Sequence, residues 1–128
     1  MLTKWWFYLA GLSGLSATAL GAYGAHGLAG SGVSAAQLAA FGTAVQYQFY
    51  HALALLLVSL ALRYKAVAGL HWAGAGFALG TLLFSGSIYA LVLLGSRGIA
   101  WLTPVGGLCF MVGWLSILLA GRAWLRSE

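Results

Sequence analysis

The sequence has almost no acidic residues. Among its 128 residues the only Asp or Glu is Glu128, and all charged residues together make up 5% of the chain. A soluble domain carries about a quarter charged residues. From Trp5 to Leu62 there is no Asp, Glu, Lys or Arg at all. Because a water-soluble fold of this composition would expose large apolar patches and aggregate, the composition excludes a soluble protein and predicts that lipid is the solvent.

The shortage of acids and cysteines also excludes classes of chemistry. Paired-carboxylate acid–base catalysis needs two carboxyl groups, and a Ser-His-Asp triad needs one. Cys109 is the only cysteine, so no intramolecular disulfide can form, and no Cys and His residues stand at metal-ligand spacing. We therefore expect a protein that is not an enzyme and that holds neither a cofactor nor a metal.

The net charge of +5 does not indicate nucleic-acid binding. A nucleic-acid-binding protein carries a clustered basic patch. Here the few Lys and Arg residues are scattered at the ends of apolar runs, where such side chains flank membrane helices. The expected partner is the lipid bilayer, with a bound lipid as a further candidate and no nucleic acid.

Apolar residues, by contrast, make up 62% of the chain and fall into four long runs. Each run can supply the roughly 20 residues that a membrane-spanning helix needs. The sequence predicts an all-α, integral membrane four-helix bundle of up-down topology, with a single transmembrane domain over 1–128 and helices at about 5–24, 35–62, 71–94 and 104–122. The first run exceeds a signal-peptide core of about 7–15 residues, so we expect it to be retained.

Two helix starts have local sequence signals. Ser34 followed by Gln37 predicts a capping box, in which each side chain satisfies a free backbone N–H. Thr103-Pro104 predicts an N-cap followed by proline at the first helical position. A helix from residue 35 to 62 would be roughly 42 Å long, against a hydrocarbon core of about 30 Å. Its first two turns should project from the membrane or lie on it with a bend near Gly42.

The basic residues predict the orientation. On one side of a four-helix arrangement only Arg97 is basic, whereas the other side carries Lys4, Arg63, Lys65, Arg122 and Arg126. Cytoplasmic loops are enriched in Lys and Arg. We therefore expect both termini and the loop between the second and third helices to be cytoplasmic.

The second helix contains a run of polar residues at membrane depth, Gln46-Tyr47-Gln48-Phe49-Tyr50-His51. Helical spacing places Gln46 beside Tyr50 and Tyr47 beside His51, with Gln48 at the margin. Because unsatisfied polar groups in hydrocarbon cost several kcal/mol each, this face should point into the bundle or into a wet cavity, with His51 near the bilayer midplane. Ser85 and Tyr89 on the third helix, and His26 after the first, are expected near the same region.

This polar cluster has a functional and a structural interpretation. A histidine can carry a proton near neutral pH, so His51 could be the centre of a ligand, proton or lipid-headgroup site. Equally, Tyr, Gln and His side chains can form hydrogen bonds between helices that only hold the bundle together. A haem held by His26 and His51 is a remote third interpretation.

Small residues recur where helices should pack closely. The predicted helix-packing positions are Gly14, Gly21, Gly76 and Gly80, of which the last two form a G-x-x-x-G spacing. Such glycines allow two backbones to approach each other. They predict packing within the monomer, or alternatively contacts in a homo-oligomer.

Four ordered blocks cover nearly the whole chain: Gly21-Ala22-Tyr23-Gly24-Ala25-His26-Gly27-Leu28, Tyr47-Gln48-Phe49-Tyr50-His51-Ala52-Leu53-Ala54-Leu55, Leu83-Phe84-Ser85-Gly86-Ser87-Ile88-Tyr89 and Thr103-Pro104-Val105-Gly106-Gly107. With them the chain resembles a family of small bacterial membrane proteins that carry a domain of unknown function and include the eukaryotic transmembrane protein 256. The resemblance implies a multi-pass protein of the bacterial inner (plasma) membrane. It implies no catalytic residues.

Two functions follow as hypotheses. The first is a non-enzymatic membrane protein that binds a lipid or protein partner or assists an assembly. The alternative is a small oligomeric channel or proton-linked transporter that uses His51 together with Tyr47, Gln48, Ser85 and Tyr89.

Overall fold

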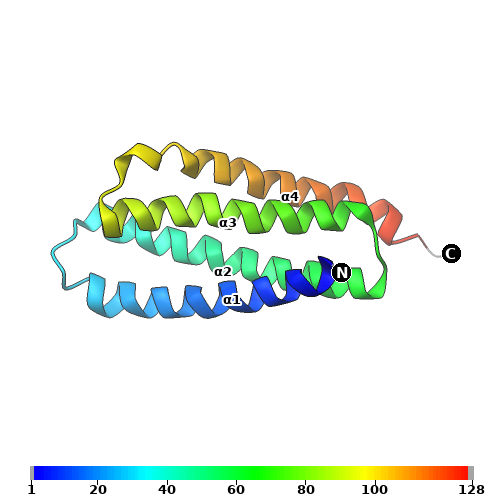
Figure 1. Ribbon diagram of the computed structural model, residues 1–128, viewed down its shortest axis with the longest axis horizontal. Helices are drawn as coiled ribbons and strands as arrows, with labels where there is room; N and C mark the ends of the chain where they lie inside the picture. Colours follow the sequence, from blue (N-terminus) through cyan, green and yellow to red (C-terminus); the bar gives the residue numbers. More distant parts are fainter. Residues whose placement is uncertain (1, 127–128) are drawn as a thin grey trace.

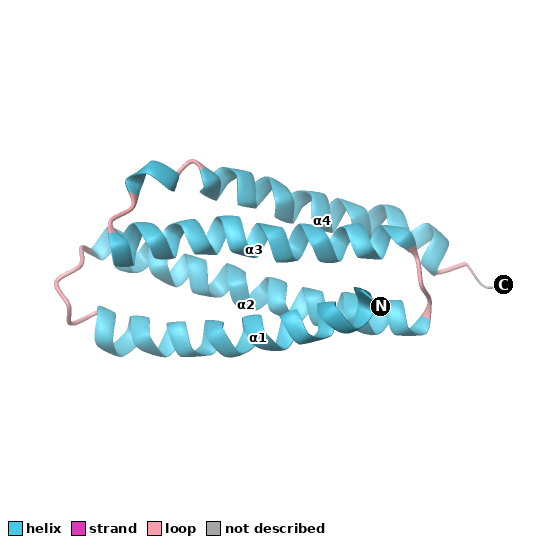
Figure 2. Ribbon diagram, viewed as in Figure 1, coloured by secondary structure: helices cyan, strands magenta, loops and turns pink. Residues whose placement is uncertain are grey.

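The computed structural model describes residues 2–126, and every secondary-structure element in that range is helical (Figure 2). The elements are α1 (Leu2–Tyr23), the π-helical continuation η1 (Gly24–Leu28), α2 (Ala35–Tyr64), α3 (Ala68–Leu94), the 3-10 turn η2 (Arg97–Ile99) and α4 (Leu102–Trp124). The bounds of the four long helices differ from the expected ones by at most three residues at either end. The predicted helical bundle is confirmed, while Glu128 lies outside the described residues.

The four long helices run up and down beside one another (Figure 1). Both ends of the described chain and the α2–α3 connection lie at one end of the bundle, and η1 and η2 lie at the other. α3 packs extensively against both α2 and α4, whereas α1 packs mainly against α2 and touches α3 at few positions. α1 and α4 are therefore the outer helices of the arrangement.

Three segments of the described chain are long and apolar enough to cross a membrane: Ala35–Tyr64, Ala68–Leu94 and Arg97–Trp124. α1 does not meet the same criterion, because it contains many glycine, serine, threonine and tryptophan residues. It nevertheless lies beside α2 along the bundle. α1 therefore joins the bundle through packing more than through the hydropathy of its own sequence.

The basic residues are segregated between the two ends of the bundle. Arg97 lies in η2, at the end of the bundle opposite to the chain termini. The end that holds the termini carries the other basic residues: Lys4, Arg63, Lys65, Arg122 and Arg126. The Lys65 ammonium group donates a hydrogen bond to the Arg126 carbonyl oxygen at 2.8 Å, which connects the α2–α3 turn to the C-terminal segment. This distribution agrees with the predicted cytoplasmic termini.

The capping box at the start of α2 is present as predicted. The Gln37 N–H donates to the Ser34 hydroxyl at 3.1 Å, and the Ser34 N–H donates to the Gln37 side-chain oxygen at 3.0 Å. From this cap α2 runs without interruption for 30 residues, or about 45 Å. Since the hydrocarbon core is about 30 Å thick, part of α2 extends beyond it.

The predicted N-cap of α4 is wrong, although the helix starts within two residues of the expected position. The helix begins at Leu102, after Trp101 as N-cap, and the Thr103 side chain makes no capping bond. Instead, the Thr103 hydroxyl pairs with the Ser87 hydroxyl of α3. Pro104 still lies within the first turn, where its missing N–H removes no intrahelical bond. A contact between helices therefore replaces the local cap that the Thr-Pro pair predicted.

Glycines allow α3 and α4 to approach closely. A Cβ at position 76 would lie 2.8 Å from the Cys109 carbonyl oxygen and 2.9 Å from Gly113 Cα. Gly80 likewise faces the Gly106 carbonyl oxygen, 3.1 Å from where its Cβ would stand. A methyl group at either site would force the two backbones apart, so the G-x-x-x-G pair lies at a helix contact within the monomer.

The two glycines predicted to pack in the first helix differ. Gly21 faces α2, where a Cβ would lie 3.3 Å from Val45 Cγ1. Gly14 is half-buried, but no neighbouring atom lies within 4 Å of where its Cβ would stand. The predicted close helix contact is therefore not seen at Gly14 in the monomer, although it lies on the same stripe of α1 as the buried Ala10 and Ala17.

Candidate functional site

Both ring nitrogens of His51 have partners from the chain itself. Nδ1 lies 2.7 Å from the Tyr47 carbonyl oxygen, and the Trp114 indole N–H donates to Nε2 at 3.1 Å. A carbonyl oxygen can only accept and an indole N–H can only donate. These partners assign the hydrogen to Nδ1 and make the ring a neutral imidazole that is fully engaged.

Aromatic side chains enclose the His51 ring. It stacks on Phe110 of α4, with ring centroids 3.6 Å apart and an angle of 7° between the planes. Phe77 of α3 lies 5.4 Å away in a tilted orientation, and Tyr47 lies 6.0 Å away on α2. The His51 side chain is buried and joins α2, α3 and α4 through packing as well as through the hydrogen bond to Trp114.

Gln48 is also buried, and it connects α2 to α1 and α3. Its amide nitrogen donates to the Ser13 carbonyl oxygen at 3.0 Å and to the Ser16 hydroxyl at 2.7 Å, both on α1. Its amide oxygen accepts from the Tyr89 hydroxyl of α3 at 2.6 Å. Gln48 therefore holds α1, α2 and α3 together, and both ends of its amide are used.

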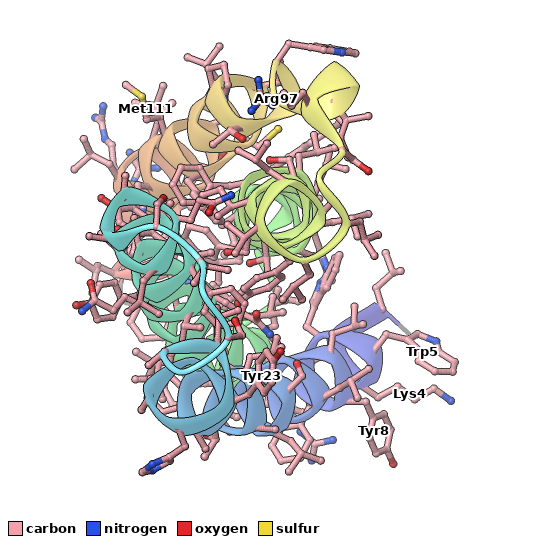
Figure 3. All side chains as sticks on the ribbon, turned by 90° about the vertical axis from the view of Figure 1, so that its left-hand side faces the viewer. Lys4, Trp5, Tyr8, Tyr23, Arg97 and Met111 are labelled. Atoms are coloured by element: carbon pink, nitrogen blue, oxygen red, sulfur yellow. The ribbon has the colours of Figure 1, made fainter. Side chains whose placement is uncertain are left out.

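Further polar contacts follow the same pattern of a side chain bonding to another helix. The buried Ser85 hydroxyl of α3 donates to the Ala44 carbonyl oxygen of α2 at 2.7 Å. The Trp124 indole of α4 donates to the Ala61 carbonyl oxygen at 3.2 Å. The cluster that the sequence predicted around His51, Gln48, Ser85 and Tyr89 is thus a network between helices. Side chains fill the space between the four helices (Figure 3).

Three of the predicted candidate residues, Gln46, Tyr50 and His26, do not join this network, and Tyr47 joins it only in part. Gln46 is exposed on the outer surface of α2, and Tyr50 is 55% exposed beside it. Tyr47 contributes its backbone oxygen and one ring face but remains 40% exposed. His26 is exposed in η1, at the far end of the bundle from the chain termini.

The buried face of α2 is therefore rotated relative to the predicted one, although it keeps His51 as expected. The buried stripe runs through Gln48 and His51, and apart from Ser59 its other members are apolar, among them Phe41, Ala44, Leu55, Val58 and Leu62. Burial of these apolar positions at i, i+3, i+4 and i+7 spacing fixes the rotation of the helix. That rotation carries Gln48 inward and turns Gln46 and Tyr50 outward, although the three are close in sequence.

The structure brings together residues that sequence reasoning did not single out. Trp114 is the partner of His51, and Ser13 and Ser16 are the partners of Gln48. The tryptophan had one indication in the sequence, because a membrane-embedded indole N–H needs an acceptor. The two serines had none, since any small polar residue in a glycine-rich helix can bond its own backbone.

A crevice between α1, α2 and α3 opens beside this network. It has a volume of about 280 Å³, and its surface is largely apolar: Leu9, Leu12, Leu55, Ala78 and Leu82 line it together with the polar residues Ser13, Ser16, Gln48, His51 and Thr81. We call it the α1–α3 crevice. Among the described residues, the Ser13 hydroxyl oxygen is the only buried side-chain polar atom without a hydrogen-bond partner.

The geometry does not support a haem held by His26 and His51. The two nitrogens of His51 already have protein partners. His26 lies at the end of the bundle where α2 begins, and His51 lies 16 residues into α2, or about 24 Å along its axis. Two axial ligands of one iron must lie on opposite faces of the same ion. No group of three or more His, Cys, Asp or Glu side chains in residues 2–126 is placed to hold a metal ion.

Comparison with known proteins gives a consistent result. Residues 20–107, which contain Gln48, His51, Ser85 and Tyr89, match the family described as "Protein of unknown function (DUF423)". No solved structure matches the chain.

Three relatives illustrate the similarity. The UPF0382 inner membrane protein YgdD of Escherichia coli strain K12 is 40% identical over 86 residues, which cover 67% of this chain and 65% of that protein. A UPF0382 membrane protein of Haemophilus influenzae is 45% identical over 76 residues, covering 59% of this chain and 60% of the relative. The UPF0382 membrane protein SAB0533 of Staphylococcus aureus is 37% identical over 83 residues, covering 65% and 67%.

The chain therefore spans slightly less than two thirds of the length of its Escherichia coli relative. The resemblance inferred from the four sequence blocks is confirmed by these matches. With its membrane-capable helices and its inner-membrane relatives, the chain is a multi-pass protein of the bacterial inner membrane and belongs to the DUF423 family of unknown function.

Proposed function

We propose that this protein is a non-enzymatic membrane protein that binds a lipid or protein partner within the bilayer, or assists the assembly of such a partner. The observation that carries the proposal is the full engagement of His51 and Gln48 by other groups of the chain. A general acid or base must reach its reactant through a free nitrogen or oxygen. Because these polar groups are already hydrogen-bonded, we expect the cluster to stabilise the bundle. The lipid or protein partner would then bind at the open surfaces between the helices.

The α1–α3 crevice is the surface that best fits a partner beside the cluster. Ser13 lines it, and the buried Ser13 hydroxyl oxygen has no hydrogen-bond partner, whereas buried polar groups of this kind are normally satisfied. A carbonyl oxygen of a lipid ester or of a partner backbone would accept its proton. Because α1 touches α3 at few positions, such a partner can lie between them without displacing a tight helix contact.

Photo-crosslinking in native membranes tests this proposal. A photoreactive amino acid at Ser13 should give a defined adduct, identified as lipid or protein by mass spectrometry. The same amino acid at Leu115, which is 53% exposed on the outer helix α4, is the control. An adduct at Ser13 that exceeds the control supports the proposal, and indistinguishable labelling at the two positions contradicts it.

A second candidate function is a small oligomeric channel or proton-linked transporter. The observation that favours it is the group of polar side chains, Ser13, Ser16, Gln48 and Thr81, within the largely apolar lining of the same crevice. Polar groups at membrane depth often mark a pathway. Four helices with an aromatic-filled centre do not enclose a pathway alone, so this function requires a homo-oligomer. Solute or proton flux into proteoliposomes, lost in His51→Ala, would support transport. Flux equal to that of empty liposomes would contradict it.

A further inference from the structure

A second recess lies between α1 and α2 at the end that carries the chain termini. Its part nearest that end has a volume of about 490 Å³ and is lined by Thr3, Lys4, Phe7, Tyr8, Leu60 and Arg63, with Ser59 at its base. A second part of about 440 Å³ continues along the two helices and includes Phe7, Gly11, Gly14, Leu53 and Leu56. Phe7 lines both parts, and Leu56 lies one helical turn from Leu60. We call the whole the α1–α2 groove.

The groove is cationic at one end only. Lys4 and Arg63 are both exposed, and Lys4 projects outward from α1 on the side away from α4 (Figure 3). The Lys4 ammonium group lies 5.7 Å from the centre of the Trp5 ring. Since the sequence has one acidic side chain for six basic ones, at most one of the six can pair with such a carboxylate. Lys4 and Arg63 therefore present positive charge where the headgroups of the predicted cytoplasmic leaflet lie.

The rest of the groove is apolar and open. No atom lies within 4 Å of where a Cβ would stand at Gly11 or at Gly14, so these positions leave an uncovered floor. Leu53 and Phe49 of α2 are 47% and 40% exposed along its wall. From Arg63 to Phe49 the groove extends along about 21 Å of helix, more than the roughly 15 Å depth of one hydrocarbon leaflet.

We propose that the α1–α2 groove binds one anionic phospholipid, with its headgroup phosphate between Lys4 and Arg63 and an acyl chain along Gly11 and Gly14. Basic pockets between transmembrane helices on the cytoplasmic side suit the phosphate-bearing headgroups of anionic lipids. The inference goes beyond the proposed function, because it assigns a second site and names the lipid class that this site binds. It places that lipid on the opposite side of α1 from the crevice beside Gln48.

Native mass spectrometry of the detergent-purified full chain tests the proposal. Phosphatidylglycerol should bind at lower concentration than phosphatidylcholine with the same acyl chains. The double variant Lys4→Gln/Arg63→Gln should weaken phosphatidylglycerol binding by about fivefold for each charge removed. The matched control Lys65→Gln/Arg122→Gln removes two charges from the same end of the bundle and should leave binding within twofold. Equal binding of the two lipids, or equal losses in the two double variants, overturns the proposal.

A second pair of variants tests the acyl-chain part and separates a lipid from a free anion. Gly11→Leu and Gly14→Leu should fill the groove, since an added Cβ has no neighbouring atom within 4 Å at either position, and Gly42→Leu is a control at an equally open position. The first two should reduce phosphatidylglycerol binding at least fivefold and the control should not. If inorganic phosphate at millimolar concentration displaces the lipid and the groove-filling variants bind as the control does, the site takes a free anion and the lipid proposal fails.

The two proposals fail separately. A crosslink at Ser13 without a preference for phosphatidylglycerol refutes the groove alone. A phosphatidylglycerol preference that depends on Lys4 and Arg63, found without a Ser13 crosslink, supports the groove and contradicts the crevice.

Discussion

The Trp114–His51 hydrogen bond joins α4 to α2 across the middle of the bundle, and the stacking of His51 on Phe110 lies beside it. Hydrogen bonds between membrane helices contribute on average about 0.6 kcal/mol, because the unfolded chain in a membrane also finds partners. Packing of a buried ring contributes more, since its loss leaves a cavity. At the scale of the residue, His51 should therefore act more through its ring volume than through its nitrogen.

A double-mutant cycle measures these two contributions. Trp114→Phe should lower the free energy of unfolding by about 0.5–1.5 kcal/mol, because Nε2 of His51 loses its donor. His51→Ala should lower it by about 2–4 kcal/mol, because the aromatic core loses a ring. In the double variant the effects should fall short of their sum by about the energy of the hydrogen bond. Denaturation in mixed micelles supplies the measurement, and strictly additive losses would contradict the pairing.

How much of the cluster could be predicted depended on the residue. Ser85 and Tyr89 were correctly expected near the α2 polar residues, because i, i+4 spacing places them on one stripe of α3. The helical spacing puts Gln48 at the margin of the polar face and Gln46 beside Tyr50 within it, whereas in the structure Gln48 is buried and the other two are exposed. The polar residues alone do not determine helix rotation, whereas the apolar residues on the Gln48 stripe do. The partners Ser13 and Ser16 depend on how α1 docks, which no local pattern encodes.

Among the elements, α3 and α4 form the closest pair, and Gly106 lies at their tightest point. A Cβ on Gly106 would collide with the backbone nitrogen and Cα of Phe84. Gly86, two residues further along α3, has open space at the corresponding position. Both glycines lie within helices, so substitutions at the two positions differ only in what the added methyl group meets.

We expect Gly106→Ala to destabilise the protein by about 1–3 kcal/mol, because the added methyl group pushes the helices apart. Gly86→Ala should be neutral or stabilising by up to about 1 kcal/mol, since alanine has the higher helix propensity. Thermal unfolding in detergent, followed by circular dichroism, compares the two variants. Equal effects at the two positions would argue against a tight α3–α4 seam at Gly106.

Helix ends show what an element's own sequence can determine. The Ser34–Gln37 box is a contact across three residues, and the structure contains it as predicted. The Thr103-Pro104 pair looked equally local, yet Thr103 pairs with Ser87, 16 residues away, and α4 begins earlier. Local signals therefore determined a helix start only where no neighbouring helix competed for the same hydroxyl group.

At the scale of the whole molecule, the segregation of basic residues predicts the orientation in the membrane. Reporter fusions at Arg97 and after Glu128 should report opposite sides, with the C-terminal fusion active in the cytoplasm. A periplasmic reporter, such as alkaline phosphatase, should be active only at Arg97. Activity of the same reporter at both sites would contradict the up-down arrangement with cytoplasmic termini.

The architecture as a whole was the most predictable property, because four apolar runs joined by short connections leave few arrangements other than an up-down bundle. The open spaces between the helices were not predictable. The α1–α3 crevice and the α1–α2 groove both depend on α1 leaning on α2 while touching α3 at few positions.

The weak attachment and modest hydropathy of α1 have a consequence for biosynthesis. α1 is the first helix of the bundle to leave the ribosome, yet it is the one that does not qualify as a span by its own composition. Insertion by the translocon depends on the apolarity of the segment presented to it. We therefore expect α1 to wait at the membrane surface until α2 has been made, so that the two enter together as a hairpin and the second helix recruits the first.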